Sequence, residues 1–348
     1  MNPESFQFGY DTFGDVTLGA DGAPVSHAQV IRNVVDEAVL ADEVGLFSVG
    51  IGEHHRDDYA ISAPEMVLAA IASRTTNLHL STAVTVLSSD DPVRVYERFA
   101  TLDALSNGRA EIILGRGSFT ESFPLFGYDL KDYQALFEEK LALFAMLREE
   151  QPVSVRGEHI QTLRDVTLYP PLEDGRTLPT WVAVGGSPES VVRAASYGLP
   201  LFLAIIGGGA ERFAPFVDLY HRALDEFDKP AQPVAFHSPG HVAATDEQAR
   251  EEFFEPWAAG MSRIGRERGW SATADRAHFE DEIEHGALLV GSPETVAAKL
   301  ARSITALGAQ RFHLKQSMGT LSHEAIMRSL ELYGTTVAPM VRDMLAES

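Results

Sequence analysis

A repeated alternation of short β-rich runs and amphipathic helical segments constrains the fold of this 348-residue chain more than any other feature. Eight strands are predicted, at 5–10, 47–51, 78–87, 110–115, 180–185, 199–206, 233–245 and 311–316. Most are followed by apolar residues at helical spacing, as in 27–45, 64–75, 92–106, 131–149 and 322–346. Eight strand–helix units predict an α/β fold, a single TIM-type (β/α)8 barrel domain over residues 1–348. A doubly wound open sheet is the alternative, but nothing marks where its strand order would reverse.

Two segments interrupt the alternation. Residues 152–171 are expected to form a small hairpin, and residues 246–286 a long, charged and mostly helical insertion. The seventh strand is expected to be interrupted or bent at Pro239-Gly240. The barrel is therefore predicted to carry two insertions.

Composition narrows the function classes. The net charge of −22 disfavours nucleic acids and anionic membranes, whose phosphates would repel the chain. The absence of cysteine excludes disulfides and thiolate chemistry. No segment is apolar and long enough for a membrane span, and the first residues lack a signal-peptide pattern. These features predict a soluble cytoplasmic protein.

The segment "SVGIGEHHRD" at 48–57 ends the second strand with Glu53, His54 and His55. A polar loop is one explanation, and a metal site or a proton-transfer site beside a cofactor are the others. Adjacent histidines in extended backbone point to opposite faces, so the two would not easily share one ion. "HSPGH" at 237–241 has ligand-like spacing, but Pro and Gly make a helix unfavourable there. We therefore expect no metal, and a metal hydrolase is a minor alternative.

Two other elements indicate a phosphate group. The fourth strand ends in Gly115-Arg116-Gly117, where a guanidinium can form paired charged hydrogen bonds and glycine lets the backbone approach. "GGSPES" at 185–190 follows the fifth strand and begins a helix, whose N-terminal N–H groups also suit a phosphate. The related "GSPET" at 291–295 is expected to be a helix cap only. Together they predict a phosphorylated cofactor or substrate.

The chain resembles the bacterial luciferase-like, flavin-dependent monooxygenase family over nearly its whole length. The similarity is carried by "EHH" (53–55), "STAVTVL" (81–87), "DPVRV" (91–95), "LDALSNGRAEIILGRGS" (102–118), "GGSPESVVRAASYGLP" (185–200) and "SHEAIMRSLELYGTTVAPMVR" (322–342). The resemblance implies a TIM barrel, FMN as the flavin and a homodimer.

The resemblance also implies site residues. His54 matches the active-site histidine, and Arg116 matches the residue that binds the FMN phosphate. Cofactor contacts are implied for a further set: Thr82, Ala83, Gly185, Gly186, Ser187, Glu189 and Ser190. A non-proline cis peptide is expected between Ala83 and Val84. Arg193 is either a second phosphate-binding cation or solvated, and the family's reactive cysteine is Gly115 here.

The predicted activity is oxidation of a small organic substrate with dioxygen and reduced FMN. A separate NAD(P)H:flavin reductase supplies the reduced FMN, or it forms in place from a nicotinamide. His54 is the candidate general acid or base. Glu53 is expected to set its tautomer or to be solvated, and Tyr10 and Thr12 either line the pocket or pack. Residues 118–129 and 246–286 are candidate pocket walls or a lid. The alternatives are a deazaflavin- or nicotinamide-linked hydride-transfer enzyme and a non-catalytic flavin-binding subunit.

Overall fold

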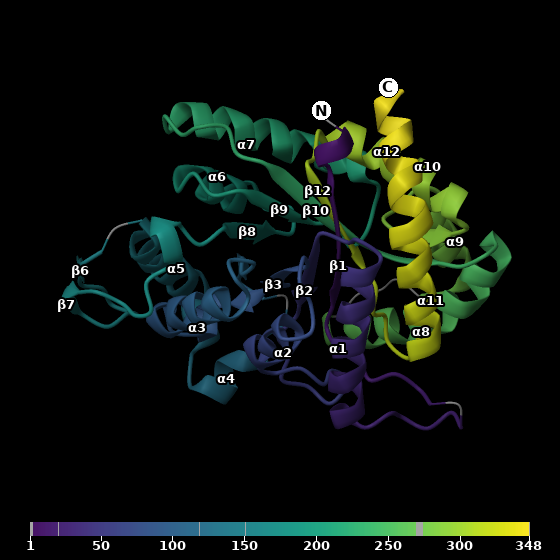
Figure 1. Cartoon of the computed structure of the whole chain (residues 1–348), viewed down its shortest axis with the longest axis horizontal. Coiled ribbons are helices and arrows are strands. Elements are labelled where there is room, and N and C mark those ends of the chain that lie inside the picture. The colour runs from purple at the N-terminus through teal and green to yellow at the C-terminus, as the bar shows by residue number, and fades with distance from the viewer. Residues whose placement is uncertain (1–2, 20, 118, 150, 269–273, 348) are drawn as a thin grey trace.

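The protein forms a parallel barrel surrounded by helices, as the computed structural model shows for residues 3–19, 21–117, 119–149, 151–268 and 274–347 (Figure 1). The strand order is β3-β2-β1-β12-β10-β9-β8-β5-β4. A parallel bridge between Leu80 and Ala110 joins β3 to the start of β5 and closes the ring. The predicted barrel, rather than an open sheet, is therefore the architecture.

The barrel strands are short, as is usual for this architecture. They are β1 (Gln7–Thr12), β2 (Ser48–Ile51), β3 (His79–Thr82), β4 (Thr85–Val86), β5 (Ile112–Gly115), β8 (Thr180–Val184), β9 (Leu201–Ala204), β10 (Val234–Val242) and β12 (Arg311–Lys315). β4 follows β3 after a two-residue break, so the predicted strand 78–87 is two strands.

Helices cover the outer face of the barrel. They are α1 (His27–Glu43), α2 (Pro64–Ala72), α3 (Pro92–Leu105), α5 (Tyr133–Glu149), α6 (Pro188–Ser196), α7 (Ala214–Glu226), α10 (Pro293–Leu307), α11 (His323–Leu332) and α12 (Ala338–Ala346). A π-helical turn, Tyr333–Val337, joins the last two helices within the predicted segment 322–346. Serine or aspartate N-caps begin several helices, and both Ser187 and Ser292 accept a backbone N–H three residues on. The expected caps of the two related motifs are thus confirmed.

The main apolar core lies between the helices and the outward side chains of the strands. Phe8, Tyr10, Val49, Leu80 and Leu114 belong to it and are almost fully buried. Tyr10 is thus a packing residue. Thr12 is buried as well, and its hydroxyl accepts a hydrogen bond from the Gly14 N–H. The pocket-lining alternative for these two positions is not supported by their contacts.

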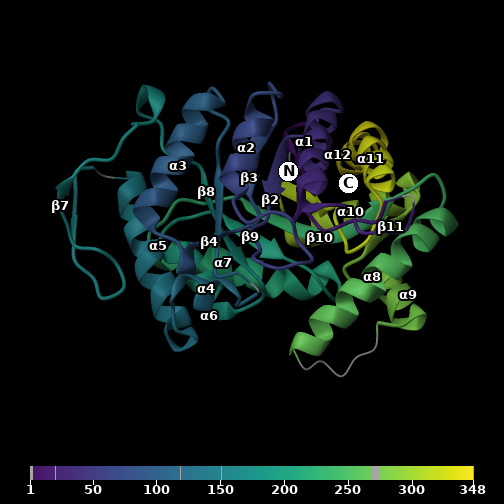
Figure 2. The same cartoon turned by 90° about the horizontal axis from the view of Figure 1, so that it is seen from below.

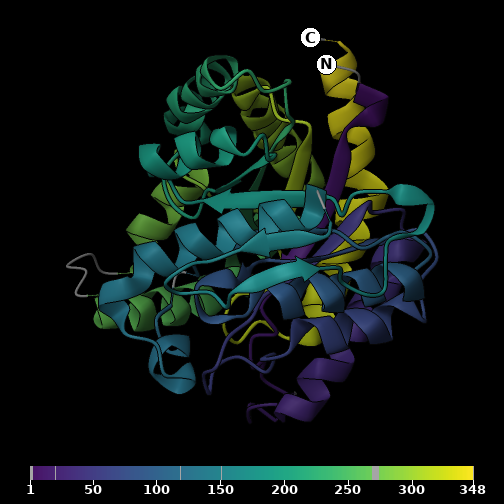
Figure 3. The same cartoon turned by 90° about the vertical axis from the view of Figure 1, so that its left-hand side faces the viewer.

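The two insertions project at opposite ends of the molecule (Figures 1 and 2). The hairpin consists of β6 (Val153–Val155) and β7 (Leu163–Val166), which pair antiparallel. Figure 3, viewed from that end, shows the hairpin outside the helices. The other insertion contains α8 (Asp246–Arg268) and α9 (Arg276–Glu284). Both predicted insertions are confirmed.

The seventh strand differs from its prediction. β10 runs without interruption through Pro239-Gly240, but it changes partner there. Pro239 is paired with Lys315 of β12, and Gly240 with Leu289 of β11 (Leu289–Gly291), a strand that sequence analysis missed. The change of partner lets the end of β10 leave the barrel and support the helical insertion. Pro239 is tolerated within β10 because the strand changes its parallel partner here, from β12 to β11.

Inward side chains stack in layers inside the barrel, with alternate strands contributing to each layer. One layer contains Ser48, Ile113, Phe202 and His313, of which Ser48 and His313 are joined by a 2.7 Å hydrogen bond. By the strand registers, the next layer toward the carboxyl ends contains Asp11, Ala83, Ala183 and His237. Above it the inward positions are Gly115, Ala204 and Lys315. Two of these three carry no side chain beyond a methyl group, so the barrel mouth is lined mostly by small residues.

Candidate functional site

His54 lies in the loop that leaves β2 and is surrounded by aromatic rings. Its imidazole stacks on Tyr59 at 4.3 Å between ring centroids, and Phe13 and Phe119 lie at 4.9 and 5.0 Å. Nδ1 is 3.7 Å from a carboxylate oxygen of Glu121, which precedes α4 (Ser122–Phe126). At this distance the pair is an electrostatic contact rather than a hydrogen bond, and Nδ1 has no hydrogen-bond partner among the described residues.

His55 has different surroundings. Its Nε2 is 3.1 Å from Glu53, and its ring packs edge-on against Phe126 at 5.0 Å. Glu53 also accepts the Val86 N–H, so it ties the β2 loop to β4. The expectation that Glu53 sets the tautomer of His54 is therefore wrong, because Glu53 faces the other histidine. The carboxylate beside His54 is Glu121, which the sequence analysis did not identify.

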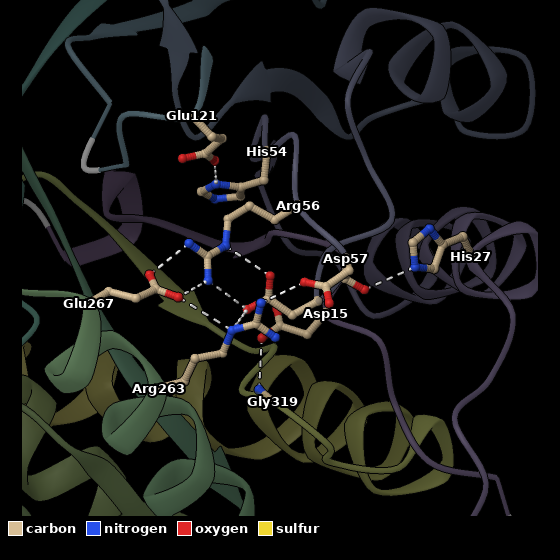
Figure 4. Close-up of polar contacts among 10 residues, drawn as sticks. Asp15, His27, His54, Arg56, Asp57, Glu121, Arg263, Glu267 and Gly319 are labelled. Atoms are coloured by element: carbon tan, nitrogen blue, oxygen red, sulfur yellow. Dashed lines mark hydrogen bonds and ion pairs between the residues drawn. The ribbon is translucent and has the colours of Figure 1, made fainter. Parts of the chain in front are cut away.

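A network of charges fastens the same loop to α8 (Figure 4). Arg56 makes two 2.7 Å hydrogen bonds to Glu267 and also binds Asp58. Arg263 binds Asp57 at 2.5 Å and Asp58 at 3.1 Å. Arg56 also lies over the Phe119 ring at 4.7 Å, so the network reaches the aromatic residues around His54. The end of α8 thus forms one wall of the site.

Arg116 directly follows β5, and its side chain reaches the start of α6. Its Nη2 donates to Ser190 Oγ at 3.3 Å, and its guanidinium lies over Tyr133 at 5.3 Å. Ser187 caps α6 and donates to Glu189 at 2.7 Å, which is the main cause of the lowered pKa of Glu189. The residues predicted to hold a phosphate from two separate motifs are therefore brought together.

Gly185 and Gly186 complete this corner of the mouth. A Cβ atom added to Gly185 would meet nothing within 4 Å, and Gly186 has a φ of +103° that disfavours other residues. Arg193, one turn along α6, is 10% exposed and donates to Glu138 at 2.6 Å. Its Nη1 has no hydrogen-bond partner in the described part of the chain. Arg193 is therefore not solvated, which excludes one of the two alternatives considered for this residue.

The predicted cis peptide between Ala83 and Val84 is confirmed. Thr82, beside it, is buried and shares a 2.8 Å hydrogen bond with Thr85. Ala83 and Val84 themselves are partly exposed. A Cβ atom at Gly115 would lie 2.5 Å from Val84, so this close approach requires glycine. The absence of the family's cysteine at this position therefore has a steric reason.

The sequence analysis did not predict that Asp11 and His237 form a pair. Asp11 Oδ2 of β1 lies 2.7 Å from Nδ1 of His237 on β10. Below them, burial lowers the pKa of His313 to about 3, so this histidine is neutral and bonds Ser48. The available signal was Asp11 at an inward position of an otherwise apolar strand.

The described residues contain no group of three or more potential metal ligands. His237 is paired with Asp11, and His241 lies 2.7 Å from Glu252. The two histidines of "HSPGH" therefore use their nitrogens in separate contacts. The described residues also contain no helix long and apolar enough to cross a bilayer.

The family described as luciferase-like monooxygenase matches residues 12–311. The chain belongs to this family. Limonene 1,2-monooxygenase of Rhodococcus erythropolis is 27% identical over 341 residues, which is 94% of this chain and 87% of that protein. The alkanal monooxygenase alpha chain of Photorhabdus luminescens is 28% identical over 62% of this chain and 59% of its own length. An N-acetyl-S-alkylcysteine monooxygenase of Bacillus subtilis is 30% identical over 65% of each.

Solved structures agree on the barrel. The monooxygenase RslO1 of Streptomyces bottropensis superposes with a TM-score of 0.82 at 23% identity, covering 96% of this chain and 99% of that one. The oxygenating component of 3,6-diketocamphane monooxygenase from Pseudomonas putida, in complex with FMN, has a TM-score of 0.78 at 20% identity, covering 97% and 98%. An F420-dependent secondary alcohol dehydrogenase has a TM-score of 0.75 at 20% identity, covering 97% and 99%. These likenesses establish the luciferase-like TIM-barrel fold.

The family match confirms that the protein is an enzyme of the oxidoreductase type, because the relatives with a named activity are monooxygenases.

The mouth of the barrel fits a polar, phosphorylated ligand on structural grounds. The buried polar atoms that lack a hydrogen-bond partner in the described part of the chain include four in residues of the barrel and its mouth: His54 Nδ1, Asp11 Oδ1, His237 Nε2 and Arg193 Nη1. A buried polar atom without a partner costs free energy, so such atoms are expected where a ligand completes the contacts.

Proposed function

We propose that the protein is an FMN-dependent monooxygenase that oxidises a small organic substrate with dioxygen. The observation that carries the proposal is the contact between Arg116 and Ser190, which joins a cation to the N-terminus of α6. Helix N–H groups, the Ser187 and Ser190 hydroxyls and the Arg116 guanidinium are together suited to a phosphate monoester. Ala83, which is partly exposed, would lie against the ring system, with the buried Thr82 behind it. Reduced FMN, when bound, supplies the electrons that activate dioxygen.

The residues of this chain have separate tasks in that reaction. His54 holds or moves a proton at Nδ1 or Nε2, since an imidazole exchanges protons near neutral pH. Phe13, Tyr59 and Phe119 exclude water around it. Glu121 places a carboxylate oxygen 3.7 Å from Nδ1 of the imidazole. Glu189 accepts a hydrogen bond from Ser187 and thereby orients the Ser187 hydroxyl beside the cofactor.

Three further features belong to the proposal. Residues 1–348 act as a single domain in the cytoplasm, and reduced FMN comes from a partner NAD(P)H reductase or from a nicotinamide in the site. The chain forms a homodimer, which is supported by exposed apolar side chains on neighbouring helices: Met66 of α2 and Leu105 of α3 are 73% and 61% exposed. Light scattering of the purified protein measures this state.

The test of FMN binding uses Arg116→Ala. A charged hydrogen bond contributes on the order of 1.5–3 kcal/mol, so the variant should bind FMN roughly ten-fold to a hundred-fold more weakly. Riboflavin, which has no phosphate, should lose little affinity, and Arg164→Ala in the exposed hairpin serves as the control. Fluorescence titration measures the FMN and riboflavin affinities of the wild type and of both variants. Equal losses for FMN and riboflavin would contradict phosphate anchoring.

Dioxygen uptake separates the proposed monooxygenase from a deazaflavin-linked hydride-transfer enzyme. The monooxygenase consumes dioxygen when reduced FMN and substrate are present, and a hydride-transfer enzyme does not. Binding of FMN without dioxygen consumption across a substrate panel would favour a non-catalytic flavin-binding subunit.

A further inference from the structure

The Asp11–His237 pair lies inside the barrel and is unused by the function proposed above. Asp11 is fully buried and His237 is 8% exposed, and the 2.7 Å contact joins Oδ2 to Nδ1. Each residue of the pair has a second polar atom, Oδ1 in Asp11 and Nε2 in His237. Neither atom has a hydrogen-bond partner within the described ranges. Two buried polar atoms at one place therefore have hydrogen-bonding capacity that the described residues do not satisfy.

The carboxylate determines which nitrogen of His237 is available. When Asp11 accepts a hydrogen bond from Nδ1–H, the proton of the neutral imidazole stays on Nδ1, and Nε2 carries the free lone pair. A carboxylate in this position also stabilises the imidazolium that forms when Nε2 takes up a proton. The arrangement prepares His237 to act as a base through Nε2.

The pair lies at the floor of the barrel mouth, beside the cis peptide. A Cβ atom added to Gly50 would be 2.9 Å from the Ala83 Cβ and 3.1 Å from the Asp11 Cβ, so Asp11 and Ala83 approach the same point. Ala83, Ala183 and Ala204 point inward and are partly exposed, so solvent reaches this depth of the barrel. The next layer down is closed by Ile113 and Phe202, which are 1% and 3% exposed.

We propose that His237 is a second proton-exchanging residue of the site, contacting the ligand at the barrel mouth through Nε2, with Asp11 as its positioning residue. The proposal rests on the proposed flavin-binding function. A ligand N–H or O–H proton passes to Nε2, the imidazolium is balanced by the Asp11 carboxylate, and the proton then returns to the ligand or to solvent. His54 acts from the loop above and His237 from the floor.

The other groups that face His237 are few. β12 contributes His313, which burial keeps neutral, and Lys315, which donates to Ser317 O and lies 4.3 Å from the Phe13 ring. β9 contributes Phe202, whose ring centroid is 6.1 Å from that of His237. Asp11 is the charged group in direct contact with His237, and Lys315 is two residues beyond His313 on the paired strand β12.

Nitrogen-15 NMR of histidine-labelled protein tests the contact directly. Addition of FMN to saturation should shift the Nε2 resonance of His237, and His313, one layer below, should not shift. The resonance is assigned by its loss in His237→Gln, or by its displacement in Asp11→Asn if the glutamine variant does not fold. An unshifted His237 resonance in protein that is saturated with FMN would overturn the proposal.

Calorimetry supplies a second measurement that does not depend on catalysis. Titration of FMN in two buffers of different ionisation enthalpy gives the number of protons exchanged on binding. His237→Gln and Asp11→Asn should change this number relative to the wild type. His241→Gln, which removes a buried histidine four residues along β10 and outside the mouth, should leave it unchanged. An identical number in the wild type and both variants would also overturn the proposal, whereas failure of the wild type to bind FMN would contradict the proposed function itself.

Discussion

His54 and His55 are neighbours in the chain but are predicted to affect different properties. His54 lies among Phe13, Tyr59 and Phe119, whereas His55 bonds Glu53 and packs on Phe126. Loss of a positioned acid or base costs about 10²–10⁴-fold in rate. His54→Ala should therefore lose product formation on that scale and still bind FMN, because the phosphate is proposed to bind at Arg116 and the start of α6.

His55→Ala is the matched control for this prediction. The substitution removes the Glu53 contact and the ring packing, so it should lower the melting temperature more than it lowers the rate. Flavin affinity, melting temperature and coupled oxidation are measured for both variants. Turnover of His54→Ala at the parent rate would mean that the pair is structural.

At the scale of elements, α8 is held to the β2 loop by charges rather than by apolar packing at its carboxyl end. Glu267→Gln removes the partner of the two 2.7 Å contacts from Arg56. Partly exposed ion pairs contribute about 0.2–1 kcal/mol, so amide exchange in residues 261–268 should accelerate by about 1.4- to five-fold. High salt should produce a similar acceleration in the wild type and little further change in the variant.

Glu251→Gln is the control for the ion pairs between α8 and the β2 loop. Glu251 lies on an exposed position of the same helix, so its loss changes the charge of α8 without breaking the contact to the loop. Exchange measured by mass spectrometry should be unchanged in that variant. Equal exchange rates in Glu267→Gln and the wild type would show that the ion pairs do not hold this end of α8.

At the scale of the whole molecule, His323 at the start of α11 is paired with the buried Glu37 of α1, at 3.0 Å. The hydrogen bond to Glu37 raises the pKa of His323 above 6.5. Because the folded-state pKa is the higher one, the pair's contribution is fully present below about pH 6.5 and is lost as the pH rises through the folded-state pKa. Asp36 and Glu324, which also raise this pKa, act in the same direction.

His323→Gln should therefore remove a pH-dependent part of the stability. The melting temperature of the wild type should exceed that of the variant by more at pH 6 than at pH 9. Thermal unfolding at both values measures the difference. His27→Gln is the control, because His27 is exposed and its hydrogen bond is to a backbone carbonyl, that of Asp57, rather than to a carboxylate. A constant difference across the pH range would exclude titration of His323 as the cause.

The sequence by itself determined the barrel and half of the site. Strand–helix alternation is a local signal, so eight units could be counted before any contact was known, and the Arg116 and Ser187-Ser190 motifs were recognisable because each fits a phosphate independently. Only the tertiary structure decided which side chains face one another. Glu53 bonds His55, Glu121 lies beside His54, and Asp11 contacts His237 across β12. The last two contacts join residues far apart in sequence, because barrel register and stagger bring their strands together. Register is set by the packing of all strands together, so no short segment contains it.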